Sequence, residues 1–308
     1  KKVYKIPIVI QSEIMIYSKT SHDLNMSIFR RHYLILSLLG SSTMLVTTII
    51  FLLFSNFMKI SQKSEGTGVS KVLFIVRTHD GNWKKLEEQA SSWLYKIPPT
   101  NLIISTSPHI SDKVLPTWLK FLEPSIFRND CPSGHSAGPA CVEAKALIAA
   151  VSTREIDFSW AFIIDDDVWA RPYEIELALE NKDPTIAYGT PGCVSDGLFG
   201  FCGGGGYAIS KFAILNLFRS TNFVNFFDSY MNLTQRTQNC DITTAQMLVN
   251  TNIRLKNMKG LHPWEKNETS LSKINNYMKE GNSVLSLHYA SGKMFKYNKL
   301  FWSRSKGK

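Results

Sequence analysis

The sequence lacks the patterns that mark structural zinc sites and nucleic-acid-binding proteins. Its 308 residues include five cysteines but no Cys-x-x-Cys pair, which argues against a structural zinc site. The formal net charge is +10, yet there is no long basic run: residues 1–32 contribute +4, and the remaining +6 is spread over the rest of the chain. Because phosphate binding needs a clustered basic face, this distribution argues against a nucleic-acid partner. No internal repeat is present.

Charge is also absent from residues 33–54, which are mostly apolar. A helix of this length, at about 1.5 Å per residue, reaches about 33 Å and would cross the hydrocarbon core of a bilayer. Arg30 and Arg31 precede the stretch, and only Lys59 and Lys63 follow it closely, so the positive-inside rule places the N-terminus in the cytosol. We therefore expect a single-pass type II signal anchor, with a cleaved signal peptide as the alternative.

The anchor divides the chain into four expected parts: a cytosolic tail at 1–32, the transmembrane segment at 33–54, a polar stem at 55–69 and a folded domain at 70–308. Met26 opens a segment that by itself resembles a complete short tail and anchor, so we expect residues 1–25 to carry no function. All five cysteines follow the anchor, in a compartment that permits disulfides. Asn232 and Asn267 begin glycosylation sequons on the same side.

Short apolar runs alternate with helical patterns in the expected folded domain. Residues 71–77, 101–106 and 160–164 are apolar runs typical of buried parallel strands. Residues 82–95 and 141–151 carry apolar side chains at helical spacing. This alternation predicts an α/β fold, whose ligands bind at the carboxyl ends of the strands.

Three adjacent carboxylates follow the strand expected at residues 160–164. Asp165, Asp166 and Asp167 raise each other's pKa unless a cation or a set of hydrogen-bond donors compensates, so their presence favours a metal site. In an extended chain Asp165 and Asp167 point the same way and offer oxygen ligands to Mn²⁺ or Mg²⁺, while Asp166 points away. The alternative is a solvated acidic turn or a helix-capping cluster.

A run of four glycines, residues 203–206, lies in the segment FCGGGGYAIS. Without Cβ atoms this stretch permits unusual backbone angles and close approach of a substrate to the backbone. The Gly-Lys-Ser/Thr ending of a P-loop is absent, which disfavours a phosphate-binding loop of that kind. We expect a sugar or an acceptor to pack here; the alternative is a flexible hairpin or a bulge.

The order of these motifs resembles the Fringe-like β-1,3-glycosyltransferases, which include core 1 galactosyltransferase and the plant Fringe-related proteins. The resemblance covers residues 71–289 and implies a nucleotide-sugar-binding domain of the GT-A type. It rests on an ordered set: Trp93, Lys145 twenty residues before Asp165, the three Asp, Trp169, GTP at residues 189–191, the glycine run, CDIT at residues 240–243 and HPW at residues 262–264.

The resemblance implies roles for individual residues. Asp167 is similar to the direct metal ligand, and Asp165 and Asp166 are similar to the donor-sugar and ribose contacts. Asp241 is similar to the catalytic base that takes a proton from the acceptor hydroxyl, with a helix N-cap as the alternative role. The remaining expected substrate-binding residues are Arg77 and Thr78, which would meet uracil and ribose, Lys145, and Gly203, Gly204, Gly205 and Gly206.

Two histidines are candidates for a further metal ligand. His262 is preferred because it follows Asp241 at nearly the spacing of the metal histidine in Fringe, although Trp264 stands where Fringe has a second histidine. His288 is held in reserve. For the cysteines, Cys131 and Cys141 bracket a loop much as a disulfide does in Fringe, and we expect them to be bonded. Cys202 could pair with Cys240 or, across a hairpin, with Cys193.

Together these features predict an inverting, metal-dependent hexosyltransferase. It would move galactose or N-acetylglucosamine from a UDP-sugar to a hydroxyl of a glycan or glycoprotein, forming a β-1,3 linkage. The expected location is the Golgi or endoplasmic reticulum membrane, with the catalytic domain in the lumen. A membrane-anchored chaperone or sugar-binding relative without catalytic activity is the alternative.

Overall fold

The protein is described by a computed structural model for residues 72–107, 117–132, 137–152, 157–263 and 271–305. These residues belong to the second of two compact units into which the chain divides, Gly68–Lys308. The expected tail, transmembrane anchor and stem lie outside the described residues, as does the sequon at Asn267. Within the described ranges, no helix is both long and apolar enough to span a membrane.

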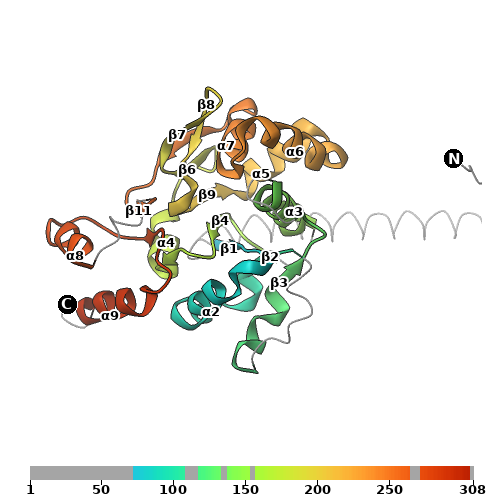
Figure 1. The fold of residues 1–308 in the computed structure, drawn as a ribbon. Coiled ribbons are helices and arrows are strands. Elements are labelled where there is room, and N and C mark those ends of the chain that lie inside the picture. Colours follow the sequence, from blue (N-terminus) through green and yellow to red (C-terminus); the bar gives the residue numbers. More distant parts are fainter. Residues whose placement is uncertain (1–71, 108–116, 133–136, 153–156, 264–270, 306–308) are drawn as a thin grey trace, which may run out of the picture. The chain divides into compact units, whose positions relative to one another are not determined.

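A seven-stranded sheet forms the centre of this unit (Figure 1). The strand order is β10-β6-β9-β4-β1-β2-β3, with bounds β1 Val72–Arg77, β2 Leu102–Thr106, β3 Ile126–Arg128, β4 Trp160–Asp165, β6 Ile186–Gly189, β9 Tyr207–Ser210 and β10 Arg254–Asn257. Only β9 pairs antiparallel, with β4 and β6; all other pairs in the sheet are parallel. The predicted α/β fold is confirmed as a mostly parallel sheet.

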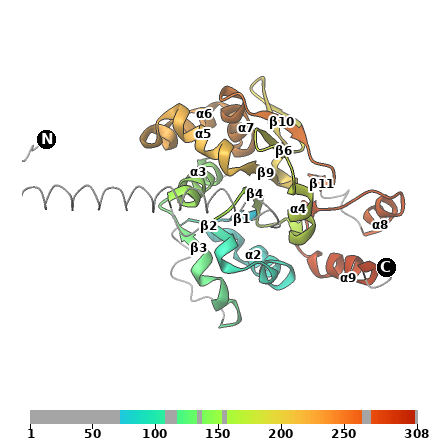
Figure 2. The same ribbon diagram turned by 180° about the vertical axis from the view of Figure 1, so that it is seen from behind.

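Helices cover both faces of this sheet, as the two opposite views show (Figures 1 and 2). One face packs against α3 Ala137–Ser152, α5 Lys211–Thr221, α6 Phe226–Thr237 and α7 Cys240–Asn250. The other packs against α2 Trp83–Ser92, α4 Pro172–Leu179, α8 Leu271–Lys279 and α9 Met294–Ser305. Strand β1 is apolar from Val72 to Val76 because alternate residues enter opposite cores: Phe74 lies in the α2 core and Ile75 in the α3 core.

Helix α2 fixes the turn that follows β4. The buried Trp93 indole donates a hydrogen bond to the carbonyl of Val168 at 3.1 Å. The buried Gln89 amide donates to the carbonyls of Asp165 and Val168, both at 2.8 Å. The backbone of the three adjacent Asp residues is therefore held on one side by the helix that follows the first strand.

A small second sheet holds the other side of the Asp segment. It consists of β11 Leu261–His262, β12 Ser286–Leu287 and β5 Trp169–Ala170, in that order. Beyond β12, the Ala290 N–H donates to the carbonyl of Asp167 at 2.8 Å. These pairings bring the segment that contains His288 next to the three Asp.

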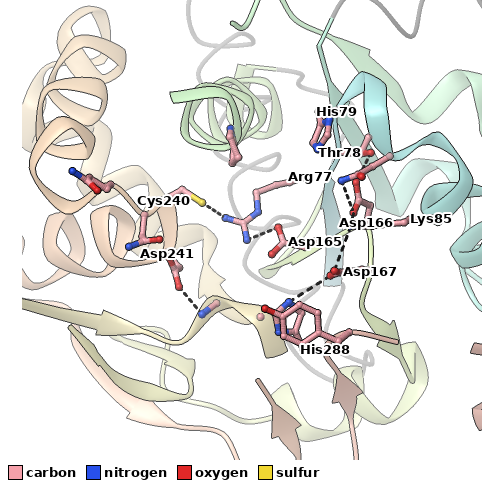
Figure 3. A pocket seen from close by; sticks show the side chains of 17 residues that line it. Arg77, Thr78, His79, Lys85, Asp165, Asp166, Asp167, Cys240, Asp241 and His288 are labelled. Atoms are coloured by element: carbon pink, nitrogen blue, oxygen red, sulfur yellow. Dashed lines mark hydrogen bonds and ion pairs between the residues drawn. The ribbon is translucent and has the colours of Figure 1, made fainter. Parts of the chain in front are cut away.

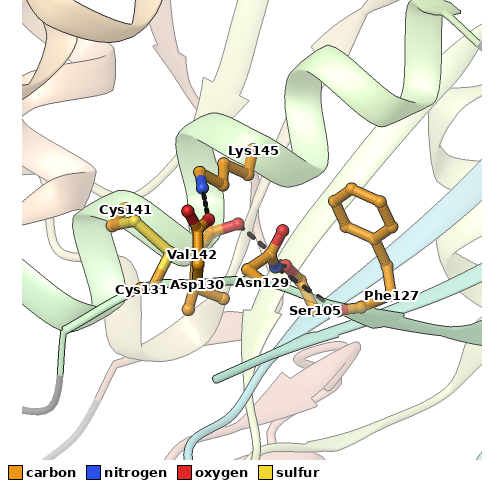
Figure 4. Close-up of a disulfide and its surroundings, with 8 residues drawn as sticks. All are labelled: Ser105, Phe127, Asn129, Asp130, Cys131, Cys141, Val142 and Lys145. Atoms are coloured by element: carbon orange, nitrogen blue, oxygen red, sulfur yellow. Dashed lines mark hydrogen bonds and ion pairs between the residues drawn. A yellow bond between two sulfur atoms is a disulfide. The ribbon is translucent and has the colours of Figure 1, made fainter. Parts of the chain in front are cut away.

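Two disulfides link residues that are close in the sequence. Cys131 is bonded to Cys141, which confirms the predicted pair (Figure 4). Cys193 is bonded to Cys202, closing the hairpin formed by β7 Pro191–Ser195 and β8 Leu198–Phe201. Of the two pairings left open for Cys202, the hairpin pairing is therefore present, and Cys240 is a buried free thiol.

Candidate functional site

A pocket of about 380 Å³ opens at the carboxyl ends of β1 and β4 (Figure 3). Its walls come from the ends of these strands, from the glycine run and from the start of α7. The residues that line it are Arg77, Thr78, His79, Asn82, Lys85, Pro139, Asp165, Asp166, Asp167, Gly203, Gly204, Gln238, Asn239, Cys240, Asp241, His288 and Tyr289. The pocket thus contains four Asp side chains against one Arg and one Lys, although the chain as a whole is basic.

All three adjacent Asp line this pocket, but each has different partners. Asp165 is the last residue of β4, and its Oδ1 forms an ion pair with Arg77 Nη2 at 2.8 Å. Residues 166 and 167 form a turn, so the strand alternation expected for the triplet does not continue, and Asp166 does not point away from the pocket. This corrects the expectation drawn from an extended chain.

Asp166 is the most enclosed of the three carboxylates. It accepts hydrogen bonds from the Thr78 hydroxyl at 2.7 Å and from the Asn82 amide at 3.2 Å, and Lys85 Nζ lies 3.7 Å away. Burial nevertheless raises the pKa of Asp166 to about 7, against the opposing effects of Thr78 and Lys85. The Thr78 hydroxyl is therefore hydrogen-bonded to Asp166 rather than free to contact a ligand.

Asp167 has an oxygen that the surrounding protein leaves unsatisfied. Its Oδ1 is buried without a hydrogen-bond partner, while His288 Nε2 lies 3.5 Å from it and Lys85 Nζ lies 3.5 Å from Oδ2. Burial lowers the pKa of His288, only partly opposed by Asp167, which favours the neutral imidazole that binds metals. An orphaned carboxylate oxygen beside a neutral imidazole fits a divalent cation. No group of three or more potential ligands is present among the described residues, so the protein would supply few of the ligands itself.

The structure separates the two candidate histidines. His262 lies in β11 outside the pocket, where its ring meets the edge of Tyr277 with centroids 4.7 Å apart, and burial lowers its pKa to about 4. The His262 carbonyl accepts a hydrogen bond from the His288 N–H at 3.0 Å. His262, which the sequence spacing favoured, thus supports the segment that contains His288, and His288 is the histidine that faces Asp167.

The glycine run forms the floor of the pocket, between the ends of β1 and β4 on one side and the start of α7 on the other. Gly203 N–H donates to Asp241 Oδ2 at 2.6 Å, and a Cβ at Gly203 would lie 2.7 Å from that oxygen. A Cβ at Gly204 would collide with the His288 ring. Gly205 and Gly206 do not line the pocket: Gly205 packs against the backbone of His262, and Gly206, at φ 84°, leads into β9.

Asp241 stands in the first turn of α7 and faces the pocket. The N-cap of this helix is Asn239, so the alternative role of Asp241 as the capping residue is not what the structure shows. Burial raises the pKa of Asp241, while Arg77 and the Gly203 N–H act to lower it. A carboxylate with a raised pKa and one backbone donor is suited to accept a proton.

Two of the expected substrate-binding residues are engaged with the protein instead. Lys145 does not line the pocket; it forms an ion pair with Asp130 beside the Cys131–Cys141 disulfide (Figure 4). Arg77 lines the pocket, but its guanidinium contacts Asp165 and Cys240 (Figure 3). It also forms an ion pair with Glu143.

Several residues at the site were not singled out by the sequence. They are His79, Asn82, Lys85, Glu143, Gln238, Asn239 and Tyr289. Glu143 had a usable signal, since it is the one acidic residue in the apolar helix run CVEAKALIAAV. A carboxylate inside such a run must either reach solvent or find buried partners.

Comparisons with known proteins add distant likenesses only. No family model and no curated protein matches the chain. Among solved structures it is similar to a glycosyltransferase involved in the glycosylation of the major capsid of PBCV-1, with 11% identity over 74% of this chain and 98% of that chain and a TM-score of 0.38. It is also similar to mannose-1-phosphate geranyltransferase from Thermus thermophilus, with 12% identity over 61% and 69% of the chains and a TM-score of 0.30. Likenesses this distant carry no argument about function, which must come from the chain's own residues.

Proposed function

We propose that the protein is an inverting glycosyltransferase of the GT-A type that uses a UDP-sugar donor. The strongest support is the opposition of two kinds of carboxylate across one pocket. Asp165, Asp166 and Asp167 lie at the end of β4 among cations and donors, whereas Asp241 lies opposite with a single backbone donor. One wall is suited to hold a charged donor, and the other is suited to accept a proton.

On the acceptor side, Asp241 would take the proton of the attacking hydroxyl. As that oxygen forms its bond to the anomeric carbon, the bond from this carbon to the UDP oxygen breaks on the opposite face, and the configuration inverts. The bare backbone of Gly203 and Gly204 lets Asp241 and His288 pack directly against it, since a Cβ at either glycine would collide with one of these side chains. The protein would contribute to this step in two ways: it would remove the proton, and it would hold the two substrates in line.

On the donor side, Asp167 and His288 would hold a divalent cation, Mn²⁺ or Mg²⁺. The cation would neutralise the charge that develops on the diphosphate as it leaves. Asp165 and Asp166 would contact the sugar and the ribose. The unpartnered Asp167 Oδ1 beside His288 Nε2 supports this assignment, since hard divalent cations prefer carboxylate oxygen ligands.

Linkage, donor and cellular location belong to the same proposal and rest on the resemblance to the Fringe-like family. The product would carry a β-1,3 linkage, and the donor would be UDP-galactose or UDP-N-acetylglucosamine. Residues 33–54 would anchor the enzyme in the Golgi or endoplasmic reticulum membrane with residues 70–308 in the lumen.

A donor screen tests this function. The full chain in detergent is incubated with Mn²⁺ and each UDP-sugar in turn, with glycan and glycopeptide acceptors, and UDP release is measured with and without EDTA. We expect release with one UDP-sugar, dependent on acceptor and abolished by EDTA. Tight UDP binding without release under any condition would instead support the non-catalytic, sugar-binding alternative.

A further inference from the structure

A fully buried carboxylate lies behind the pocket, and the proposed transfer assigns it no contact with either substrate. Glu143 is in the middle of α3, has no exposed surface and does not line the pocket. Its Oε2 accepts from Arg77 Nη1 at 2.5 Å, and its Oε1 accepts from the Tyr207 hydroxyl and the Thr244 hydroxyl, each at 2.5 Å. One carboxylate thus connects α3 with β1, β9 and α7.

The partner of Glu143 connects the two walls of the pocket. Arg77 Nη2 lies 2.8 Å from Asp165 Oδ1, at the donor wall. Arg77 Nη1 also contacts Cys240 Sγ at 2.5 Å, and Cys240 is the residue directly before Asp241. The guanidinium therefore lies between the end of β4 and the start of α7 (Figure 3). Glu143 holds it from α3.

Stability alone does not account for this pair. Burying two charges costs much of what their attraction returns, and apolar side chains of similar volume often serve a core as well or better. The planar guanidinium, by contrast, holds several acceptors at fixed angles, which an apolar side chain cannot do. Geometry at the pocket is therefore the better explanation for Arg77 and Glu143.

We infer that Glu143 is a positioning residue for sugar transfer: through Arg77 it fixes Asp165 relative to the first turn of α7, and so sets the distance between the donor and Asp241. The inference rests on the proposed function. It also reassigns Arg77 from contact with uracil to the alignment of the two walls.

The same pair influences the proton affinity of the proposed base. Around Asp241, Arg77 from β1 and the Gly203 N–H lower its pKa, whereas burial, Asp165 from β4 and Glu143 from α3 raise it. Removing the charge of Glu143 should therefore lower the pKa of Asp241, and removing the charge of Arg77 should raise it. The acid limb of the pH–rate profile should move to lower pH in Glu143→Gln and to higher pH in Arg77→Met.

A double-variant design separates positioning from folding. Glu143→Gln and Arg77→Met each leave a buried partner uncompensated and should unfold more readily, whereas the double variant Arg77→Met/Glu143→Gln should regain most of the stability. We expect the stable double variant to lose about 10- to 100-fold in kcat with little change in the donor KM, because a small misplacement of reacting groups is enough for such a loss. Arg171→Met/Glu174→Gln is the matched control, since that Arg–Glu pair lies outside this pocket and should leave kcat unchanged.

Either of two results would overturn the inference. One is a stable double variant with the kcat of the unmodified protein. The other is a shift of the acid limbs of the two single variants in the same direction on the pH axis. The crystal structure of the double variant gives a readout that needs no turnover, because Arg77 contacts both Asp165 and Cys240 at the start of α7. We expect the Asp165 carboxylate to shift relative to the first turn of α7 even if no UDP-sugar is turned over, in which case only the proposed function fails. An unchanged separation would show that the pair does not set the position of the two walls.

Discussion

The carboxylates on the two walls of the pocket have different hydrogen-bond and ion-pair partners. At the strand-end wall, Asp166 and Asp167 are surrounded by Thr78, Asn82 and Lys85, which compensate negative charge. At the helix wall, Asp241 receives one hydrogen bond from the backbone N–H of the glycine run. The carboxylates of the two walls thus differ in the donors that they receive. Four experiments can break or sharpen this division, from the largest expected effect to the smallest.

The helix wall is tested by Asp241→Asn. The amide keeps the shape of the side chain but cannot accept the acceptor's proton, so turnover should fall by about 10² to 10⁴. UDP and Mn²⁺ should still bind, which calorimetry can measure, because their proposed contacts lie on the other wall. Asp228→Asn, in the first turn of α6, is the matched control. Loss of UDP binding together with turnover would mean that the two walls do not act separately.

The strand-end wall is tested by the pH dependence of stability in the metal-free protein. The unfolded chain releases the Asp166 proton near pH 3.8, whereas the folded protein releases it near pH 7. The free energy of unfolding should therefore fall as the pH rises from about 4 to about 7, by at most about 4 kcal/mol at roughly 1.4 kcal/mol per pKa unit. Urea unfolding in EDTA measures this, and Asp166→Asn should remove the fall. If the free energy of unfolding did not change over this pH range, Asp166 would be a carboxylate that remains charged in the folded protein.

The metal assignment separates the two histidines. His288→Ala should weaken Mn²⁺ binding by at least about 10- to 100-fold, since even the loss of a group that merely supports a ligand costs this much. His262→Ala should have a smaller effect because its ring lies outside the pocket. This order reverses the preference drawn from sequence spacing, and Mn²⁺ titrations of both variants decide it. A larger effect of His262→Ala would restore that preference.

The glycine floor gives the smallest expected effect. In Gly204→Ala the new methyl group meets the His288 ring, which must move away. We expect Mn²⁺ binding to weaken by a few-fold, less than in His288→Ala, because the ring can shift rather than disappear. Equal effects of the two substitutions would indicate that the ring has no alternative position, and no effect would indicate that His288 does not bind the metal.

The strand-end wall was largely predictable because its signal is local. An apolar run followed directly by three Asp defines both the strand and the position of the carboxylates at its end. Trp93 was singled out by the resemblance and by the helical spacing of residues 82–95, and the structure shows its contact: the indole N–H donates a hydrogen bond to the carbonyl of Val168. The alternation expected for the Asp residues failed because the chain turns after Asp165, and spacing alone cannot reveal such a turn.

The helix wall depends on contacts that no local pattern contains. Gly203 and Asp241 are 38 residues apart, and Glu143 is 101 residues from Thr244. Asp241 was found through the ordered motifs, but its backbone donor and the guanidinium behind it were not. The spacing that favoured His262 could not show that the parallel pairing of β11 with β12 brings His288 next to Asp167.

The hairpin β7–β8 has a consequence for protein engineering. Its tip, Asp196 and Gly197, has left-handed backbone angles and an open surrounding, and its base is closed by the Cys193–Cys202 bond. A peptide tag or fluorophore site inserted at the tip would be isolated from Gly203 by that covalent bridge. The hairpin therefore offers a site for immobilising or labelling the protein while the glycine floor keeps its conformation.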